Sequence, residues 1–412
     1  MGVVVGGLFA YASGNEISPK EVGILLIRKI YILLFAPIAL LIHMLSPLVL
    51  IRIGAVYSQR IGHLGLDLEL SLCHDKSRKQ NSRFPKNIAV FYLKGSISNA
   101  YLLGLWREKI VILPKWVLYP VHVINQQLPS YAKYNYFDWV EQTGHKDFSL
   151  FDRYPSTLSI PFRDLDRGEK LLQDLGIGKN QPYICLAVRD NAYLDQQDRK
   201  TDWSEHDYRD SDIANYLEMA EFLAGCGYVV LRMGQIVKTA FKSTNPNVID
   251  YANSSLRSDF ADVFLFSTCS FCISTSTGMD ALASIFRIPT GLVNVVSTDS
   301  VALGELVRIF QPKQFIDQLT GRALTYKEIL HRNLSAIYRT SDFVRYGINL
   351  IENTPEDLRL FAEELLGILA LEGVVHGRGN EIRPTPMYGA VKKERMDKLS
   401  KSWLRNHQNY MK

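Results

Sequence analysis

Residues 250–294 read DYANSSLRSDFADVFLFSTCSFCISTSTGMDALASIFRIPTGLVN, and this stretch decides the fold. Ser258 is typical of a helix N-terminus, and apolar residues at helical spacing follow it. The apolar run 271–273 then predicts a short buried strand that ends in a polar turn. A second helix follows the turn, and a second strand ends at Asn294. The order helix, strand, turn, helix, strand predicts a parallel α/β sheet.

The polar turn is a candidate phosphate-binding element. It consists of Ser274, Thr275, Ser276, Thr277 and Gly278. Backbone N–H groups and the positive end of the following helix would lie at the carboxyl edge of the sheet, where they suit a diphosphate. The alternative is that Ser276 and Thr277 only cap the helix.

The composition is that of a globular protein with a small positive charge. The chain has 412 residues, of which 47% are hydrophobic and 22% charged, and its formal net charge is +5. At ~150 residues per domain, this length predicts two domains. We find no basic tract dense enough for sequence-independent DNA binding, and expect no nucleic-acid partner. The charge suits nucleotide phosphates or an anionic membrane surface.

The cysteines indicate a reducing compartment, because their odd number forms no disulfide framework. Cys269 and Cys272 form a CxxC sequence, but no second pair or histidine tract accompanies it, so we interpret both as small buried residues. The five cysteines are Cys73, Cys185, Cys226, Cys269 and Cys272.

The N-terminal region contains an uncharged apolar segment at 30–51, with Lys29 before it and Arg52 after it. Its length would cross a bilayer, but Pro37 and Pro47 interrupt it. We favour a monotopic or re-entrant anchor at the cytoplasmic face of the membrane. A transmembrane span and a buried core helix remain as alternatives.

Two Rossmann-like domains are expected after this segment. A strand at 48–57 leads into a Gly-containing turn and a helix, although without the dinucleotide motif GxGxxG. A nearly continuous apolar strand at 182–188 starts the second domain. The expected parts are a membrane-associating segment at 1–47, an N-terminal domain at 48–164, a C-terminal domain at 165–373 and a loosely ordered basic, polar tail at 374–412.

Polar residues follow the predicted strands of the second domain where each strand ends. Because ligands collect at the carboxyl ends of parallel strands, we expect these residues to form a binding site. Arginine forks suit a diphosphate, and Asp250 or Asn294 would accept hydrogen bonds from ribose or a base. The alternative is that Arg189, Asp190 and Arg232 form ordinary salt bridges. The candidates are Arg189, Asp190, Tyr193, Arg232, Gly234, Asp250 and Asn294.

The sequence RIGHLG at 60–65 provides a candidate general base. An imidazole on a Gly-containing turn could take a proton from a hydroxyl group, so we assign the catalytic role to His63, with Arg60 assisting. A purely structural histidine is the alternative. Asp67 and Glu69 alternate with leucines and indicate a solvated face.

We assign no metal and no cofactor. The DxD sequences at 164–166 and 210–212 resemble a metal–nucleotide motif, but neither follows a convincing buried strand. The motifs of P-loop, GxSxG and HExxH enzymes are missing from the sequence.

Seven segments resemble a bacterial glycosyltransferase family linked to surface polysaccharide synthesis. They are RIGHLG at 60–65, YICLAVRDNAYL at 183–194, YRDSDIANY at 208–216, VVLRMG at 229–234, VIDYA at 248–252, SDFADVFLFSTCSFCISTSTG at 258–278 and IPTGLVNVV at 288–296. More remotely, the chain is similar to GDP-fucose-dependent fucosyltransferases, which have the two-Rossmann-domain GT-B fold. Arg189 matches the diphosphate-binding arginine of their His-x-Arg motif, whereas Ala187 replaces the histidine, whose role is not carried over.

The resemblance implies a metal-independent glycosyltransferase with a nucleotide-sugar donor and a glycan or lipid-linked acceptor. The C-terminal domain would bind the donor and the N-terminal domain the acceptor. We expect a protein bound to the cytoplasmic face of the membrane and transfer of a hexosyl or deoxyhexosyl group. The alternatives are a nucleotide-sugar hydrolase or epimerase and a non-catalytic, membrane-attached polysaccharide assembly factor.

Overall fold

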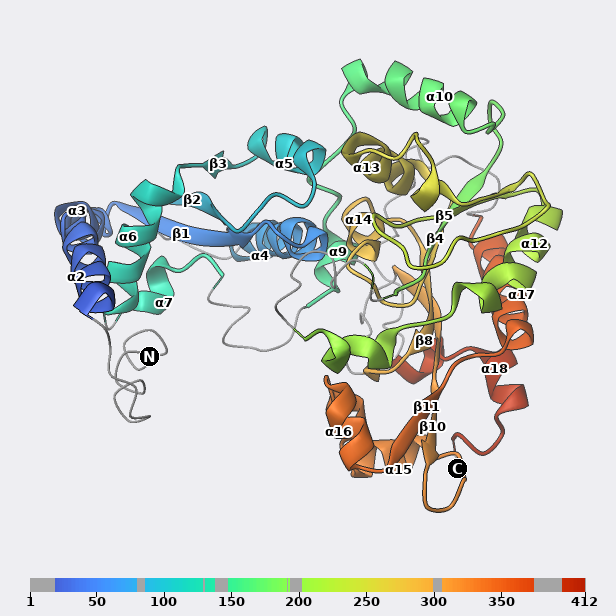
Figure 1. The fold of residues 1–412 in the computed structure, drawn as a ribbon. Coiled ribbons are helices and arrows are strands. Elements are labelled where there is room, and N and C mark those ends of the chain that lie inside the picture. The colour runs from blue at the N-terminus through green and yellow to red at the C-terminus, as the bar shows by residue number, and fades with distance from the viewer. Residues whose placement is uncertain are drawn as a thin grey trace. The chain divides into compact units, whose positions relative to one another are not determined.

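The computed structural model describes residues 19–79, 86–128, 130–137, 147–190, 192, 202–298, 306–373 and 395–411. The chain forms two compact units that alternate along the sequence. The first unit contains residues 1–57, 81–96 and 110–144, and the second contains 58–80, 97–109 and 145–412. Each unit holds a parallel sheet with helices, which confirms the expected α/β class (Figure 1).

The sheet of the first unit has three parallel strands in the order β1-β2-β3. Residues Ile53, Tyr92 and Val121 are buried together in the core that its helices form with this sheet. The elements are β1 (Val49–Tyr57), β2 (Lys86–Lys94), β3 (Val111–Ile112), α2 (Pro19–Leu33), α3 (Ala36–Leu45), α6 (Lys115–Gln126) and α7 (Tyr131–Tyr134).

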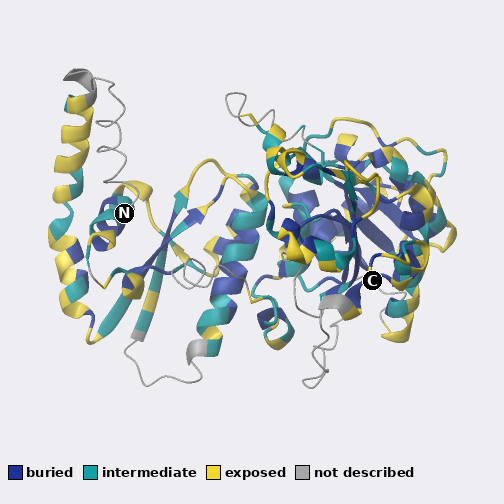
Figure 2. Cartoon of the chain, turned by 90° about the horizontal axis from the view of Figure 1, so that it is seen from below, coloured by how far each residue is buried: buried dark blue, intermediate teal, exposed yellow. Residues whose placement is uncertain are grey.

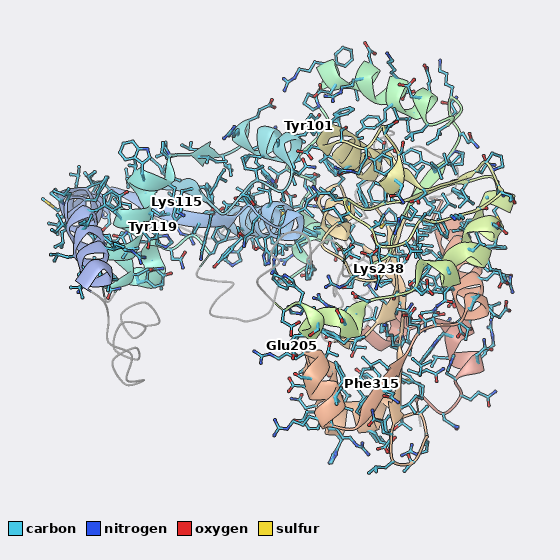
Figure 3. The ribbon with its side chains drawn as sticks, in the orientation of Figure 1. Tyr101, Lys115, Tyr119, Glu205, Lys238 and Phe315 are labelled. Carbon is cyan, nitrogen blue, oxygen red and sulfur yellow. The ribbon has the colours of Figure 1, made fainter. Side chains whose placement is uncertain are left out.

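The helical stretch Val22–Leu45 in α2 and α3 is long and apolar enough to cross a membrane, and only 6% of its most apolar window is buried. Figure 2 shows this exposure along the helices. The alternative of a buried core helix therefore does not agree with the structure. Arg28 of α2 donates a hydrogen bond to Tyr119 of α6, and Lys115 lies above the same ring, 5.9 Å from its centre (Figure 3).

The second unit contains a six-stranded parallel sheet in the order β6-β5-β4-β7-β8-β9. This is the doubly wound order, in which the direction of winding reverses between the first and fourth strands, here β4 and β7. Ligands of such sheets bind at the carboxyl ends of these two strands. The strands are β4 (Tyr183–Ala187), β5 (Val229–Arg232), β6 (Val248–Ile249), β7 (Cys272–Ser274), β8 (Thr290–Val295) and β9 (Val307–Pro312).

Helices cover this sheet, and an antiparallel pair, β10 (Gln314–Asp317) and β11 (Ile348–Ile351), lies beside it. Asp212 caps the helical segment that leads into α12. Cys269 and Cys272 are buried, as expected. The helices are α4 (Leu68–Lys79), α5 (Ala100–Arg107), α9 (Leu150–Arg153), α10 (Leu165–Asp174), α12 (Leu217–Gly225), α13 (Asp259–Thr268), α14 (Asp280–Ile285), α15 (Tyr326–His331), α16 (Thr340–Arg345), α17 (Pro355–Leu371) and α18 (Lys401–Asn406).

The C-terminal segment 395–411 packs on the second unit, which differs from the loosely ordered tail expected from its polar composition. Leu399 forms a bridge to Phe310 of β9, and Trp403 is 1% exposed. The Glu364 carboxylate accepts hydrogen bonds from the backbone N–H groups of Lys401 (2.9 Å) and Ser402 (2.8 Å). A few apolar anchors and one helix cap thus order a segment whose average composition is polar.

We predict that Trp403→Ala lowers the free energy of unfolding by about 3–5 kcal/mol, because it leaves a cavity under α18. Chemical denaturation of the purified chain measures this change. Phe162→Ala is the control, since Phe162 is 90% exposed, and should change stability by less than about 0.5 kcal/mol. Equal stability of Trp403→Ala and the wild type would show that the C-terminal segment does not pack as described.

Candidate functional site

A cavity of about 420 Å³ lies in the second unit where β4 and β7 end. This is the reversal point of the sheet, where the strand order predicts a ligand. Eight of the residues predicted from the sequence line it, namely Arg60, His63, Arg189, Asp190, Gly234, Ser276, Thr277 and Gly278. The structure therefore brings together three parts that are distant in the sequence: RIGHLG at 60–65, the end of β4, and the polar turn at 274–278, which we call the hydroxyl turn.

Two glycines place RIGHLG directly on the hydroxyl turn. A Cβ atom on Gly62 would lie 3.3 Å from both the Cα and the carbonyl oxygen of Gly278. A Cβ atom on Gly65 would lie 2.4 Å from Cδ1 of Ile285 in α14. Side chains at these two positions would push the segment away, so the glycines permit the close backbone approach that carries His63 to the cavity.

His63 pairs with Asp67 in a single π-helical turn, η1 (His63–Asp67). Its Nδ1 lies 2.7 Å from Oδ2 of Asp67. An ionised carboxylate only accepts hydrogen bonds, so Nδ1 carries the proton and Nε2 is the nitrogen that can accept another one. The sequence interpretation of Asp67 as part of a solvated face missed this pairing, although the spacing of four residues was a usable signal.

Glu69 is fully buried, so its assignment to a solvated face is wrong. Its Oε1 accepts hydrogen bonds from Nη2 of Arg287 (2.6 Å) and from the backbone N–H of Thr157 (3.0 Å). The alternation with leucines was interpreted as a solvated face, whereas the segment is helical and Glu69 points towards the body of the second unit. The buried pair fixes the start of α4, and with it η1.

Arg189 extends from the end of β4 into the cavity lining, and its side chain is 13% exposed. Nε donates to Oδ1 of Asp210 at 3.1 Å, while the backbone N–H donates to the hydroxyl of Thr275 at 2.9 Å. Burial is the largest influence on the Arg189 pKa and lowers it, followed by the charge of Arg209. Burial likewise raises the pKa of Asp210 to about 6.

The segment η3 (Ser204–Arg209) contributes two cavity residues that the sequence analysis missed, His206 and Arg209. The His206 ring stacks on Trp203 with 5.8 Å between ring centres. The guanidinium of Arg60 lies above the same Trp203 ring at 5.4 Å. Of these two residues, only Arg209 falls within a segment quoted for the family resemblance, 208–216.

The hydroxyl turn forms several of its hydrogen bonds internally. The Ser274 hydroxyl donates to Asp280 at 2.8 Å, the Thr277 N–H donates to Ser274 at 3.4 Å, and the Met279 N–H donates to the Thr277 hydroxyl at 3.1 Å. Ser276 has φ +60, a backbone conformation that costs about 1–3 kcal/mol and concentrates at functional sites. Burial raises the pKa of Asp280, which also lines the cavity, to about 6.

Arg232 lies beneath the cavity and is 1% exposed. Nη1 pairs with Oδ1 of Asp250 at 3.0 Å, and Nη2 lies 3.7 Å from Oδ2 of Asp190. Asp190 and Asp250 also accept the backbone N–H groups of Lys238 (2.8 Å) and Phe241 (2.9 Å). The salt-bridge alternative therefore describes the contacts of Arg232, which hold both ends of the loop that carries Gly234.

Other predicted residues are engaged within the protein. The Thr275 side chain is buried and accepts from the Arg189 N–H. The buried Asn294 side chain donates to Tyr216 at 2.8 Å and accepts from the Asn353 N–H at 2.7 Å. Neither belongs to the cavity lining. Tyr193 lies outside the described residues.

Comparisons with known proteins found distant structural similarity only. No family model and no curated protein matches the chain. The solved structures that resemble it include Escherichia coli ADP-heptose lipopolysaccharide heptosyltransferase II, with 13% identity, a TM-score of 0.40, and coverage of 78% of this chain and 99% of that chain. A glycosyl transferase family 9 protein from Veillonella parvula has 9% identity, a TM-score of 0.35, and coverage of 59% and 79%.

The E. coli heptosyltransferase WaaC, solved with ADP-2-deoxy-2-fluoro heptose, has 10% identity, a TM-score of 0.29, and coverage of 60% and 89%. These proteins are glycosyltransferases, and they give no support to the expected similarity to GDP-fucose-dependent fucosyltransferases. Likenesses of this degree do not establish the activity of this chain.

We predict that Asp280→Asn changes how stability depends on pH. A folded-state pKa of about 6, raised from 3.8, means that the folded chain holds a proton more tightly, so the wild type loses stability as pH rises from about 4 to 6. Asparagine does not ionise, and the variant should therefore gain on the order of 1–3 kcal/mol relative to wild type across this window.

Urea denaturation at several pH values measures the difference in unfolding free energy between variant and wild type. Asp317→Asn is the control. Hydrogen bonds from Arg332 and the backbone lower the Asp317 pKa, so its difference should stay flat between pH 4 and 6. If the difference in unfolding free energy between Asp280→Asn and wild type is also constant between pH 4 and 6, the pKa of Asp280 is not raised in the folded chain.

Proposed function

We propose that the chain is a glycosyltransferase that moves a sugar from a nucleotide-sugar donor to a glycan or lipid-linked acceptor. The observation that supports this most is one cavity that combines a guanidinium group from Arg189, the hydroxyl turn with Thr277, and the His63–Asp67 pair. Its place at the reversal point of a doubly wound sheet suits a nucleotide ligand. Residues 48–164 would form the acceptor domain and 165–373 the donor domain.

The chemistry needs a base and a stabilised leaving group. Nε2 of His63 would take the proton from an acceptor hydroxyl while Asp67 holds the ring through Nδ1. The acceptor oxygen then forms a bond to the anomeric carbon, and the bond from that carbon to the diphosphate oxygen breaks. The diphosphate leaves with the electron pair, and Arg189 stabilises its charge. This electrostatic stabilisation would suffice for transfer without a metal ion, as the sequence resemblance implies.

The proposal is tested by nucleotide binding followed by transfer. At least one of UDP, GDP, ADP, CMP and dTDP should raise the melting temperature of the full chain by mass action. With a matching nucleotide sugar, His63→Gln should lower the transfer rate by about 10²–10⁴-fold while the dissociation constant of the nucleotide stays the same, because only the proton acceptor is lost. His331→Gln, on α15 and outside the cavity lining, should transfer at the wild-type rate.

Two outcomes would contradict the proposal. One is that none of the nucleotides binds, which would favour a non-catalytic assembly factor. The other is release of free sugar, or an interconverted donor, without any dependence on an acceptor. That result would identify a hydrolase or epimerase at the same cavity.

We further propose that α2 and α3 attach the chain to the cytoplasmic face of the membrane, near a lipid-linked acceptor. Leu34 is 71% exposed and Met44 is 77% exposed, and Arg28 and Lys29 suit anionic headgroups. Replacing both exposed residues by aspartate should release the chain from vesicles of phosphatidylcholine and phosphatidylglycerol in a flotation assay, since each charge costs about 2.5–3.5 kcal/mol at bilayer depth.

Leu371→Asp is the control for this experiment, because Leu371 is 91% exposed in the second unit. It should leave vesicle binding unchanged. Undiminished flotation of the variant with Leu34→Asp and Met44→Asp would show that α2 and α3 do not mediate attachment.

A further inference from the structure

Three nitrogen atoms of the cavity residues have no hydrogen-bond partner within the described part of the chain. They are Nη2 of Arg189, Nε of Arg209 and Nδ1 of His206, and all three atoms are buried. A buried donor without an acceptor costs about 1–3 kcal/mol, and more when the donor is charged. Arg189 follows β4 while the other two residues lie on η3, so two separate elements contribute residues with unpaired nitrogens to the lining of one cavity.

Among the described residues, three arginines and four acids lie at this end of the cavity. Burial lowers the pKa of His206, and the positive charges of Arg209, Arg189 and Arg60 lower it further. The acidic groups near these cations are Glu205, Asp207, Asp210 and Asp190. Asp210 pairs with Nε of Arg189 and Asp190 lies near Arg232. Of these four acids only Asp190 belongs to the lining, together with Arg60, Arg189 and Arg209.

The segment η3 is held in place from the side away from the cavity. Glu205 accepts hydrogen bonds from the backbone N–H (3.3 Å) and the hydroxyl (2.7 Å) of Ser341 at the start of α16. The Tyr208 N–H donates to the hydroxyl of Thr340 at 3.1 Å. Figure 3 shows Glu205 at the junction of these elements. A segment fixed in this way presents His206 and Arg209 in a constant position, so they bind without first becoming ordered.

The hydroxyl turn has the opposite character. The groups that act on the Asp280 carboxyl are the Ser274 hydroxyl and the Thr277 N–H, and no described cation contributes to its pKa. A carboxylate here repels an anion, and the N–H groups of Thr277 in the turn and of Met279 directly after it already have acceptors. Hydroxyl groups of a neutral ligand suit this end, since a carboxylate accepts their hydrogen bonds.

We propose that Arg189, Arg209 and His206 form the anion subsite of the cavity and bind the diphosphate of the donor, while Thr277 and Asp280 face its sugar. The assignment of the sugar rests on the proposed function, whereas the anion subsite does not. It assigns the diphosphate to Arg189 and η3, whereas the sequence pattern placed it on Arg189, Arg232 and the hydroxyl turn together. The arginine fork and the imidazole supply charge-assisted hydrogen bonds to phosphate oxygens, the strong class of such bonds.

Inorganic pyrophosphate is the probe, measured by isothermal titration calorimetry on the full chain. Wild type should bind it, and Arg209→Gln should weaken binding by about 10–100-fold, as expected for one lost hydrogen bond to a charged group. Arg209→Lys keeps the positive charge but loses the planar pair of guanidinium N–H donors. Its affinity for pyrophosphate should lie between those of wild type and Arg209→Gln. Orthophosphate should bind more weakly than pyrophosphate, because it meets fewer donors at once. Arg163→Gln removes an exposed arginine outside the lining and should bind as wild type does.

Thr277→Val tests the other end of the cavity and should leave pyrophosphate binding within about threefold of wild type, because this end contributes little to the anion. Unchanged melting temperatures of the variants establish that they are folded. The proposal is overturned if wild type does not bind pyrophosphate, if Arg209→Gln binds it equally well, or if Thr277→Val abolishes binding. Pyrophosphate binding that depends on Arg209 without any sugar transfer would reject the transferase and keep the subsite. Sugar transfer at the wild-type rate by Arg209→Gln would reject the anion subsite and keep the transferase.

Discussion

The buried ion pair between Arg287 and Glu69 is the interaction on which the site depends. Arg287 adopts φ +61 and donates hydrogen bonds to the Glu69 carboxylate and to the carbonyl oxygens of Tyr154 and Ile285. Removing one partner of such a pair leaves an unpaired buried charge, which costs about 3–5 kcal/mol. The pair connects α4 to the entry of β8, and α4 continues directly from the turn that carries His63. The pair therefore anchors the segment that carries the candidate base.

A second buried charge, Arg232, organises the floor of the cavity. It connects Asp190 after β4 to Asp250 after β6, and these carboxylates in turn fix backbone N–H groups of the loop after β5. Gly234 in this loop leaves no room for a Cβ atom, which would lie 2.5 Å from Val237. The loop is therefore rigid on one side and lines the cavity on the other. The ligand contacts proposed for Arg189 would depend on this support from Arg232, which is outside the cavity lining.

The sequence predicted the positions of the central elements well, because buried parallel strands such as β4 appear as continuous apolar runs. It predicted the directions of side chains poorly. Arg189 lies two residues beyond β4 whereas Arg232 is the last residue of β5, and of the two only Arg189 lines the cavity. An apolar run does not show at which residue the strand ends. Arg209 was missed because η3 reaches the cavity only through its packing on α16. The packing of Trp403 was missed because the prediction for the tail used its average composition, which is polar and does not reveal single buried apolar residues.

The alternation of the two units along the chain has a consequence for biosynthesis. Glu69 and Arg287 are 218 positions apart, which at ~5–20 residues per second corresponds to roughly 10–40 s between their emergence from the ribosome. During that interval α4 carries a carboxylate and apolar side chains that have no partner yet. The apolar segment Val22–Leu45 is synthesised earlier still. The nascent chain therefore has to keep its first hundred residues from aggregating until the last third of the sheet is complete, and chaperones would act on this early stage.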